Sequence, residues 1–425
     1  MIAVLAGVML ICILPALNFA AGSSARELDV AEVLRAAEAI SPDLKAAMQQ
    51  EAQARQAIGI IQSEYYPTLD LEGTQSYGFP GSNGALGVRG LAGSPFRDGP
   101  GGDAVTQLSL FDLGRHARFK TAQAQLIAAQ ERTKIIRFEV YLAALQIYFD
   151  GVRFRGQQEA WKDIGSDVAR VAGVVDKLVK NGQHSVAEHL LVADQTHEAA
   201  MLEAAYAERY GIALRRLELF TGIPETGVAC PPPQAVSEAG LSAIQPGEAS
   251  PLIVTAEAQA ALAHTAISER TAENYPVLLG LASVGDVNQA HLLSKQDYSG
   301  GFAVTMPLFK GFRIQDEIHQ AQALAAERDQ GLVSSKLSVA ELNARYDETI
   351  AASRAEIEYL KVARGDAEEA LKQTWRRYLT YVGPLVEVRE AIRNLGRIKS
   401  QAIDIKTDLL LALSSKAVLN GGYVK

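Results

Sequence analysis

The segment Tyr66–Tyr77, with the sequence YPTLDLEGTQSY, separates polar from apolar side chains along an extended chain. The even-numbered residues from Thr68 to Ser76 are all polar, whereas Leu69 and Leu71 fall on the opposite face. An alternation with a period of two is typical of a β-strand between two different environments. The pattern therefore predicts a strand over residues 68–77.

Three further segments follow the same pattern, over residues 104–111, 277–288 and 302–308. From Phe302 to Leu308 the even-numbered residues are apolar, and Ala303 and Thr305 lie on the other face. Taken in chain order, the four strands form two hairpins. Residues 78–102, which are rich in glycine, are expected to be the first hairpin loop, and residues 290–298 the second.

The positions of the prolines indicate two long helical hairpins. No proline lies between Pro100 and Pro224, and Pro384 is the only one after Pro307. Because proline in a helix interior costs about 3 kcal/mol, these gaps permit very long helices. We predict helical hairpins over residues 113–220 and 311–420, with tips near 181–185 and 380–384. A helix over residues 113–180 would be on the order of 100 Å long.

The two halves of the chain share one plan. Ser41-Pro42 and Tyr66-Pro67 recur as Ser250-Pro251 and Tyr275-Pro276, an offset of 209 residues (251 − 42). Glu188 and Gly222 recur as Glu387 and Gly421 at an offset of 199 (387 − 188). We therefore expect a first repeat over residues 26–222 with a hairpin at 67–112, an irregular linker over 223–250, and a second repeat over 251–425 with a hairpin at 276–309.

The N-terminal residues 1–25 are expected to be a secretory signal peptide. Ile2 to Ala21 carry no charge and run into the small residues 20–25. This combination is typical of an apolar signal core and its cleavage region. The segment lacks the usual Lys or Arg before the apolar run, so an uncleaved membrane anchor or a misassigned start codon stays open. Cleavage would leave Cys230 as the only thiol.

Membrane insertion would require more than one copy of the chain. Beyond residue 22 no apolar stretch reaches the roughly 18 residues of a membrane helix, so spanning segments would have to be strands. Four strands are too few for a barrel, whereas three chains of four strands would close a twelve-stranded one. Aromatic residues near the strand ends suit interfacial girdles: Tyr65, Tyr66, Tyr77, Phe79, Phe111, Tyr275, Tyr298 and Phe309. A soluble pair of β-hairpins with an ordinary aromatic core is the alternative.

Several short motifs in this order resemble the TolC-like outer membrane efflux and secretion proteins over residues 27–422. They are Tyr66-Pro67, Tyr275-Pro276, Pro307-Leu308-Phe309-Lys310-Gly311, Arg377-Tyr378 and Val386-Glu387-Val388. The resemblance implies an α+β membrane protein that forms a homotrimer. Its helical hairpins would build a periplasmic α-barrel, and its strands a trimeric 12-stranded outer-membrane β-barrel.

The resemblance also implies a closable entrance at the helical tips. Glu387 and Glu390 match paired acidic residues that ring the lumen in this family, and Glu188 and Tyr378 match its tip-gating positions. Three copies of two glutamates would attract cations and make the constriction cation-selective. Spacing alone favours a solvated helix face for Glu387 and Glu390, and only the family match favours the ring in the lumen.

The tip residues expected to contact an adaptor protein are Asn181, Gly182, Tyr381, Gly383 and Pro384. Two of them depart from the family pattern. Gly383 stands where an arginine often links neighbouring tips, and Tyr381 stands where glycine is usual. Arg377 and Arg389 are the residues that could replace the missing arginine.

Composition and motifs argue against other classes of function. The net charge of −8 offers nothing to attract nucleic acid. His184, His189 and His197 do not have the spacing of metal ligands on a helix, so no metal site is expected. The chain contains no phosphate-binding loop and no nucleophile elbow, and we expect neither a cofactor nor enzymatic activity.

The sequence therefore predicts a passive exit duct in the cell outer membrane that projects into the periplasm. Its expected partners are a periplasmic adaptor (membrane fusion) protein, an inner-membrane pump of the ABC or proton-driven type, and outer-membrane lipid. A periplasmic coiled-coil adaptor or scaffold protein is the alternative. The sequence leaves open whether the cargo is a small molecule of an efflux system or a polypeptide of a type I secretion system.

Overall fold

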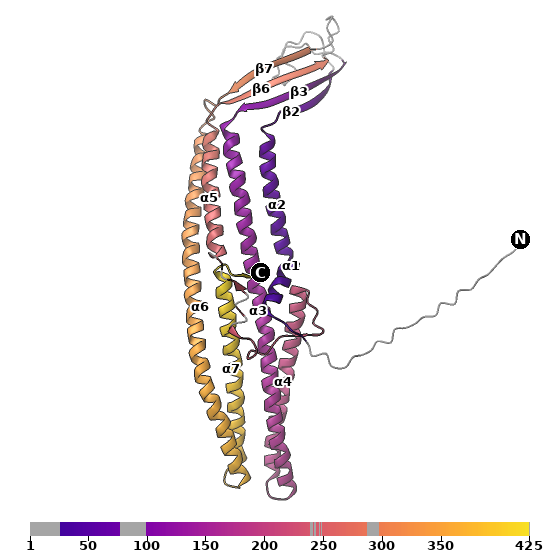
Figure 1. Cartoon of the computed structure of the whole chain (residues 1–425), viewed down its shortest axis with the longest axis vertical. Helices are drawn as coiled ribbons and strands as arrows, with labels where there is room; N and C mark the ends of the chain where they lie inside the picture. The colour runs from indigo at the N-terminus through magenta and orange to yellow at the C-terminus, as the bar shows by residue number, and fades with distance from the viewer. Residues whose placement is uncertain are drawn as a thin grey trace, which may run out of the picture.

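The computed structural model describes residues 26–76, 99–238, 241, 244–245, 247, 249–286 and 297–424. The chain is an elongated body with a β-sheet at one end and two helical tips at the other (Figure 1). The predicted signal peptide, Tyr77, Phe79 and most of both predicted hairpin loops lie outside the described residues.

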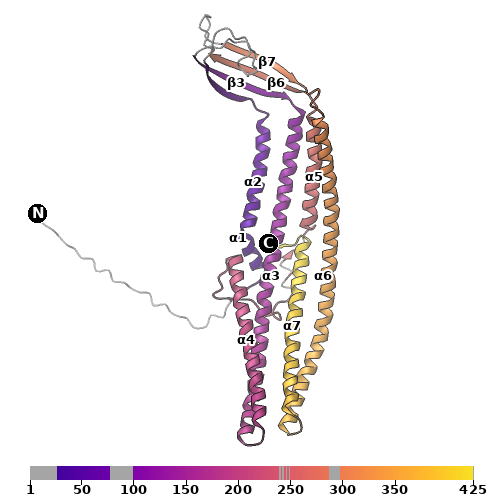
Figure 2. The ribbon, with the colours of Figure 1, turned by 180° about the vertical axis from the view of Figure 1, so that it is seen from behind.

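Seven helices of the described ranges form most of the body. They are α1 (Val30–Ile40), α2 (Pro42–Ser63), α3 (Leu113–Lys180), α4 (Val186–Thr221), α5 (Pro251–Ala272), α6 (Arg313–Leu379) and α7 (Leu385–Leu419). With 68 residues, α3 is about 100 Å long at 1.5 Å per residue. Both α3 and α6 run from the sheet to the tips, as Figures 1 and 2 show from opposite sides.

The helices lie side by side in a single layer. In the half nearer the sheet, α2 contacts α3, α3 contacts α5, and α5 contacts α6. In the half nearer the tips, α4 takes the place of α2 and α7 the place of α5. One lateral edge of the layer is thus formed by α2 and α4, and the other by α6 (Figure 1).

Equivalent helix ends recur in both halves of the chain. Pro42 and Pro251 each occupy the first position of a 22-residue helix, which is where proline is best tolerated. At the tips, Gly182 and Tyr381 both have a positive φ, of 73° and 62°. These two positions are 199 residues apart (381 − 182), the offset that the sequence gives for this region.

The sheet contains four antiparallel strands in the order β2-β3-β6-β7. Their bounds are β2 (Thr68–Ser76), β3 (Gly99–Phe111), β6 (Val277–Asp286) and β7 (Asp297–Thr305). The strand predicted over 302–308 ends earlier, at Thr305, because Pro307 has no N–H to donate to a ladder. β3 starts at Gly99, inside the predicted loop, where its backbone pairs with the end of β2.

The strand register collects apolar side chains on one face of the sheet. Leu69 of β2 pairs with Thr106 of β3, and Leu71 pairs with Ala104. Directly paired residues of antiparallel strands share a face. Continued through β6 to β7, this face carries six exposed apolar side chains: Leu69, Leu71, Val284, Tyr298, Phe302 and Val304. The predicted separation of polar and apolar faces thus extends across both hairpins.

The largest hydrophobic core lies at mid-height, where the C-terminus returns to the body (Figure 1). Tyr141, Tyr148 and Phe149 of α3 pack there with Leu410 of α7. The linker between the repeats takes part in this core through Cys230, which is buried. Burial raises the pKa of the Cys230 thiol to about 12.

The linker is more ordered than the prediction of an irregular segment implies. Its β4 (Val228–Ala229) pairs in parallel with β1 (Arg26–Glu27). Its β5 (Ile244–Gln245) pairs with β8 (Tyr423–Val424). These two-residue bridges tie both ends of the described chain to the linker, and they carry too few residues for any periodicity to be recognised in the sequence.

Across the described part of the chain, none of the helices combines the length and the apolar character that crossing a membrane demands.

Close contact between the linker and α3 yields a prediction about stability. A Cβ on Gly156 would lie 2.6 Å from Cδ of Pro233 and 3.1 Å from Cγ2 of Ile403. We expect Gly156→Ala to lower the free energy of unfolding by about 1–3 kcal/mol, measured by urea denaturation in detergent. Gly173→Ala is the matched control in α3, because no atom lies within 4 Å of its Cβ position. The control should stabilise by about 0.4–1 kcal/mol, and equal effects of the two variants would contradict this account.

Candidate functional site at the helical tips

The two helical tips lie next to each other at the end of the molecule opposite the sheet (Figure 1). The first tip is the turn between α3 and α4, where the Ser185 hydroxyl accepts a hydrogen bond from the N–H of Glu188. The second tip is the turn between α6 and α7, and Pro384 is the N-cap of α7. The tips therefore bring together residues that are about 200 positions apart in the sequence.

Tyr378 links the two tips. Its ring is 1% exposed and belongs to a hydrophobic cluster with Val168, Val192 and Val388. Its hydroxyl donates a hydrogen bond to Oε2 of Glu188 at 3.2 Å. Burial, followed by the Glu188 carboxylate, raises the pKa of Tyr378 above its ordinary value. The hydroxyl therefore stays protonated and remains a donor.

His184 completes this cluster. Its Nδ1 lies 2.6 Å from Oε2 of Glu188. Its ring stacks on Tyr381 with a centroid distance of 5.3 Å and lies 5.0 Å from the ring of Tyr378. Sequence reasoning considered His184 only as a metal ligand and missed this contact. His184 lies just before the N-cap Ser185 of α4, and Glu188 lies in the first turn of that helix, so their closeness in the sequence was the signal that could have indicated the contact.

Glu387 and Glu390 are each next to an arginine of the same chain. The Glu387 carboxylate pairs with Arg377 at 2.8 Å, and the Glu390 carboxylate pairs with Arg389 at 3.2 Å. Arg377 and Arg389 are the residues considered as replacements for the missing tip arginine. A Cβ on Gly383 would lie 3.2 Å from Cβ of Arg377.

The outer surface of the tips is apolar and exposed. It is formed by Val186, Leu190, Tyr381, Val382 and Val386, whose exposed fractions run from 44% to 69%. Asn181 and Gly182 are also exposed. Contiguous exposed apolar surface at the end of a long rod is typical of a site for another protein.

Among the described residues, no group of three or more His, Cys, Asp or Glu side chains is arranged to hold a metal ion. The nearest acidic contact of His189 is Asp176, with 3.8 Å between Nδ1 and Oδ1.

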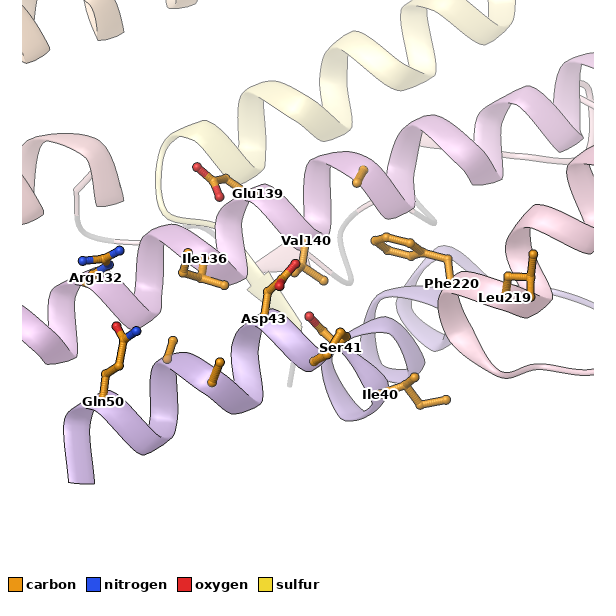
Figure 3. A pocket seen from close by; sticks show the side chains of 14 residues that line it. Ile40, Ser41, Asp43, Gln50, Arg132, Ile136, Glu139, Val140, Leu219 and Phe220 are labelled. Carbon is orange, nitrogen blue, oxygen red and sulfur yellow. The ribbon is translucent and has the colours of Figure 1, made fainter. Parts of the chain in front are cut away.

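A groove of about 610 Å³ opens on the lateral edge formed by α2 and α4 (Figure 3). Its walls come from the junction of α1 and α2, from α3 and from the end of α4. Ile40, Ile136 and Leu219 give it an apolar lining, with Asp43, Arg132 and Glu139 among the polar side chains (Figure 3).

Comparisons with known proteins agree with this architecture. Residues 33–222 match the family model of the outer membrane efflux proteins. No curated protein sequence matches the chain significantly. The outer membrane protein VceC of Vibrio cholerae is similar in structure, with 17% identity, a TM-score of 0.78, and coverage of 93% of this chain and 97% of VceC.

Two further solved outer membrane channels are also similar in structure. The MtrE outer membrane channel of Neisseria gonorrhoeae, in its open state, has 16% identity and a TM-score of 0.72, covering 95% of this chain and 94% of MtrE. The CmeC outer membrane channel of Campylobacter jejuni has 14% identity and a TM-score of 0.73, covering 92% of this chain and 86% of CmeC. At these identities the similarity establishes a shared fold.

The predicted resemblance to TolC-like outer membrane efflux proteins is thereby confirmed. Residues 33–222 match the outer membrane efflux protein family, and nearly the whole chain has the fold of solved outer-membrane channels. An efflux protein transports its substrate without transforming it, in agreement with the expectation that the chain is not an enzyme.

The hydrogen bond between the tips leads to a prediction about local stability. We expect Tyr378→Phe to accelerate amide exchange at residues 378–388 about fivefold, because a buried hydrogen bond is worth about 1 kcal/mol. Hydrogen-exchange mass spectrometry measures this directly. Tyr359→Phe is the control, because Tyr359 lies on the same helix and is 73% exposed. Equal exchange in the two variants would show that the hydroxyl of Tyr378 does not hold the tips together.

Proposed function

We propose that three copies of the chain assemble into an exit duct in the cell outer membrane. The duct passively conducts substrates that an inner-membrane pump delivers, in a tripartite efflux or type I secretion system. Four strands from each chain form a twelve-stranded β-barrel in lipid, and the helical layers form an α-barrel in the periplasm. Each of the two structural repeats, residues 26–222 and 251–425, supplies one long helical hairpin, so each chain contributes two.

The observation that carries this proposal is the sheet with one apolar face and two unpaired edges. Among the strands that the structure describes, β2 and β7 are the outer ones, and each pairs with a neighbour on one side only. In a membrane every backbone N–H and C=O must be hydrogen-bonded. Pairing β2 of one copy with β7 of the next satisfies both edges, and twelve strands close the ring. The apolar face, with Leu71 and Phe302, then faces lipid, and Asp70 faces the lumen.

The helical layer supports the same arrangement. The groove of Figure 3 opens on the edge formed by α2 and α4. On the opposite edge, α6 exposes Val333 (52%) and Leu337 (67%). Lys336 pairs with Glu257 of α5, and Thr255 of α5 bonds to Glu131 of α3, so this part of α6 is at the height of the groove. Two different edges that fit each other give a head-to-tail contact, which closes into a ring.

The tips form the periplasmic entrance in this proposal. Glu387 and Glu390 of three chains line the constriction, and the contact of Tyr378 with Glu188 holds it closed. Arg377 and Arg389 reduce the negative charge at these glutamates, so the constriction is weakly cation-selective. The tip residues Asn181, Gly182, Tyr381, Gly383 and Pro384 contact the periplasmic adaptor, which in turn binds an ABC or proton-driven pump.

Crosslinking across the proposed interface tests the assembly. Ala46 is exposed in the groove, and we expect the variant Ala46→Cys/Leu337→Cys to form disulfide-linked trimers in outer-membrane fractions under oxidation. Denaturing electrophoresis without reductant reads out the product. In the control Ala46→Cys/Tyr359→Cys, the second cysteine is 22 residues further along α6 (359 − 337), about 33 Å away, and no crosslinked trimer is expected. A detergent-free, water-soluble monomer in place of a trimer would overturn the proposal.

The acidic ring gives a second test, by single-channel recording in lipid bilayers. We expect Glu387→Ala/Glu390→Ala to abolish cation preference and block by divalent ions, because it removes six carboxylates from the constriction. Arg377→Gln should act in the opposite direction, since it frees the Glu387 carboxylate. The control Glu348→Ala/Glu356→Ala removes the same charge from α6 away from the tips. Reversal potentials unchanged in all variants would place the selectivity site elsewhere.

A further inference from the structure

The two lateral edges of the helical layer carry opposite charges in the half nearer the tips, where α4 forms one edge and α6 the other (Figure 2). Arg209 and Arg216 of α4 are exposed, and neither pairs with a carboxylate among the described residues. Glu348 and Glu356 of α6 are also exposed, and the described part of the chain offers neither of them a cationic partner. Each edge thus presents charge that its own chain leaves uncompensated.

Contacts between neighbouring helices give the height of each residue along the layer. On one side of α3, Arg155 lies over the ring of Tyr210 of α4, with 5.7 Å between Cζ and the ring centroid. On the other side of α3, Gln157 donates a hydrogen bond to Oδ1 of Asp404 in α7 at 3.1 Å. The part of α4 around Tyr210 is therefore level with the part of α7 around Asp404.

The contacts between α7 and α6 extend this line to the opposite edge. Ile405 of α7 packs against the hydrophobic cluster that contains Leu360 of α6. Ile357 of α6 packs against the cluster that contains Leu409 of α7. The part of α6 that starts near Ile357 is therefore level with the same positions of α7, and through them with Tyr210 of α4.

The charges of the two edges match in height. Arg209 and Glu356 each precede a residue of this common level by one position. Toward the sheet, Arg216 lies seven residues further along α4 and Glu348 eight residues back along α6, which is about 10 Å and about 12 Å. Copies in a closed ring are related by rotation about its axis, so residues of equal height on the two edges meet.

The other charges near this line do not oppose the match. Residues 209–216 contain three arginines and no acid, whereas residues 348–358 contain three glutamates and one arginine. That arginine, Arg354, pairs with Glu238 of the linker at 2.8 Å. Glu208 of α4 comes level with Glu358 of α6, and Lys361 pairs with Glu358 at 2.8 Å. The facing stretches are therefore basic on α4 and acidic on α6.

Exposed apolar side chains accompany the charges on both edges. On α4, Met201 (64% exposed) and Ile212 (43%) are eleven residues apart, which is three turns and places them on one face. On α6, Ala351, Ala355 and Val362 are exposed at spacings of four and seven, as in a coiled-coil seam. Met201 and Val362 both lie about 10 Å from the first charge pair, on the side of the tips.

We propose that Arg209 and Arg216 of one copy form ion pairs with Glu356 and Glu348 of the next copy, along a contact between α4 and α6. Apolar helix faces alone can slide past each other by a turn, whereas charges at a set spacing favour one register and one partner. The ion pairs thus fix the relative height of neighbouring copies and select a second copy of this chain. The inference rests on the proposed ring of three copies and adds its register and its specificity.

Charge reversal and its rescue test the ion pairs. We expect Arg209→Glu to lower the fraction of heat-resistant trimer about tenfold, because repulsion replaces attraction at three interfaces. Semi-native electrophoresis of the detergent-extracted full-length protein measures this fraction. Arg209→Glu/Glu356→Arg should restore the trimer. Arg397→Glu is the matched control and should leave the trimer intact, because Arg397 is an exposed arginine without a carboxylate partner among the described residues, on α7 inside the layer. A reversal without effect, or a double variant as weak as the single one, overturns the proposal.

Crosslinking separates this proposal from the proposed duct. We expect Met201→Cys/Val362→Cys to form disulfide-linked trimers in outer-membrane fractions under oxidation. In the control Met201→Cys/Leu337→Cys, the second cysteine is 25 residues away along α6 (362 − 337), about 38 Å, and no linked trimer is expected. A wild-type protein that stays monomeric contradicts the duct and the ion pairs together. Trimers that link through Ala46 and Leu337 but not through Met201 and Val362 contradict the α4–α6 contact alone.

Discussion

The unpaired lateral edges of a single-layered chain constrain the rest of this structure. A globular protein covers its sheet with a second layer. In this chain, the described helices and strands form a single layer whose two lateral edges have no further described element beside them. An open edge strand offers unpaired N–H and C=O groups to any strand that approaches. The two edges differ, so in the proposed assembly each copy contacts the next one head to tail. In a closed ring, every lateral edge of one copy is paired with an edge of a neighbouring copy.

The tips obey a second constraint, because a buried apolar cluster and a polar link join the two hairpins there. Beneath the polar link, Tyr378 packs with Val168 and Val175 of the first hairpin and with Leu385 of the second. Above it, Glu188 collects hydrogen bonds from His184 and Tyr378. The apolar cluster holds the two hairpins together but does not define their orientation. The hydrogen bonds are directional and fix one position of the hairpins relative to each other. In the proposed duct, the polar link at Glu188 therefore fixes the relative position of the two hairpins at the entrance.

Long-range patterns in the sequence predicted where the helices and strands lie along the chain. They did not predict which of these elements lie side by side in the structure. Proline-free tracts and period-two alternation located α3, α6 and the four strands, because these signals accumulate over many residues. The adjacency of β3 and β6 could not be read from the chain, since it depends on which hairpins meet in space. The same holds for the linker bridges at Val228–Ala229 and for the ion pair between Arg377 and Glu387. Motif positions gave Tyr378 and Glu188, but only coordinates place His184 between them.

The duplicated tips show how one backbone has acquired two different surfaces. At the first tip, Gln183 N–H bonds to the carbonyl of Leu178, and at the second, Val382 N–H bonds to that of Arg377. Both are the i to i−5 bonds of a helix cap whose preceding residue is left-handed. That residue is Gly182 in one tip and Tyr381 in the other.

A tyrosine in the left-handed region costs roughly 1–2 kcal/mol more than glycine. The stack of Tyr381 on His184 recovers a comparable amount, since aromatic pairs contribute about 0.5–1.5 kcal/mol. The cap therefore tolerates Tyr381 because its ring has a partner on the opposite tip. It follows that the departure from glycine at position 381 and the presence of histidine at position 184 are one feature, which joins the strained turn of the second hairpin to the imidazole ring of the first.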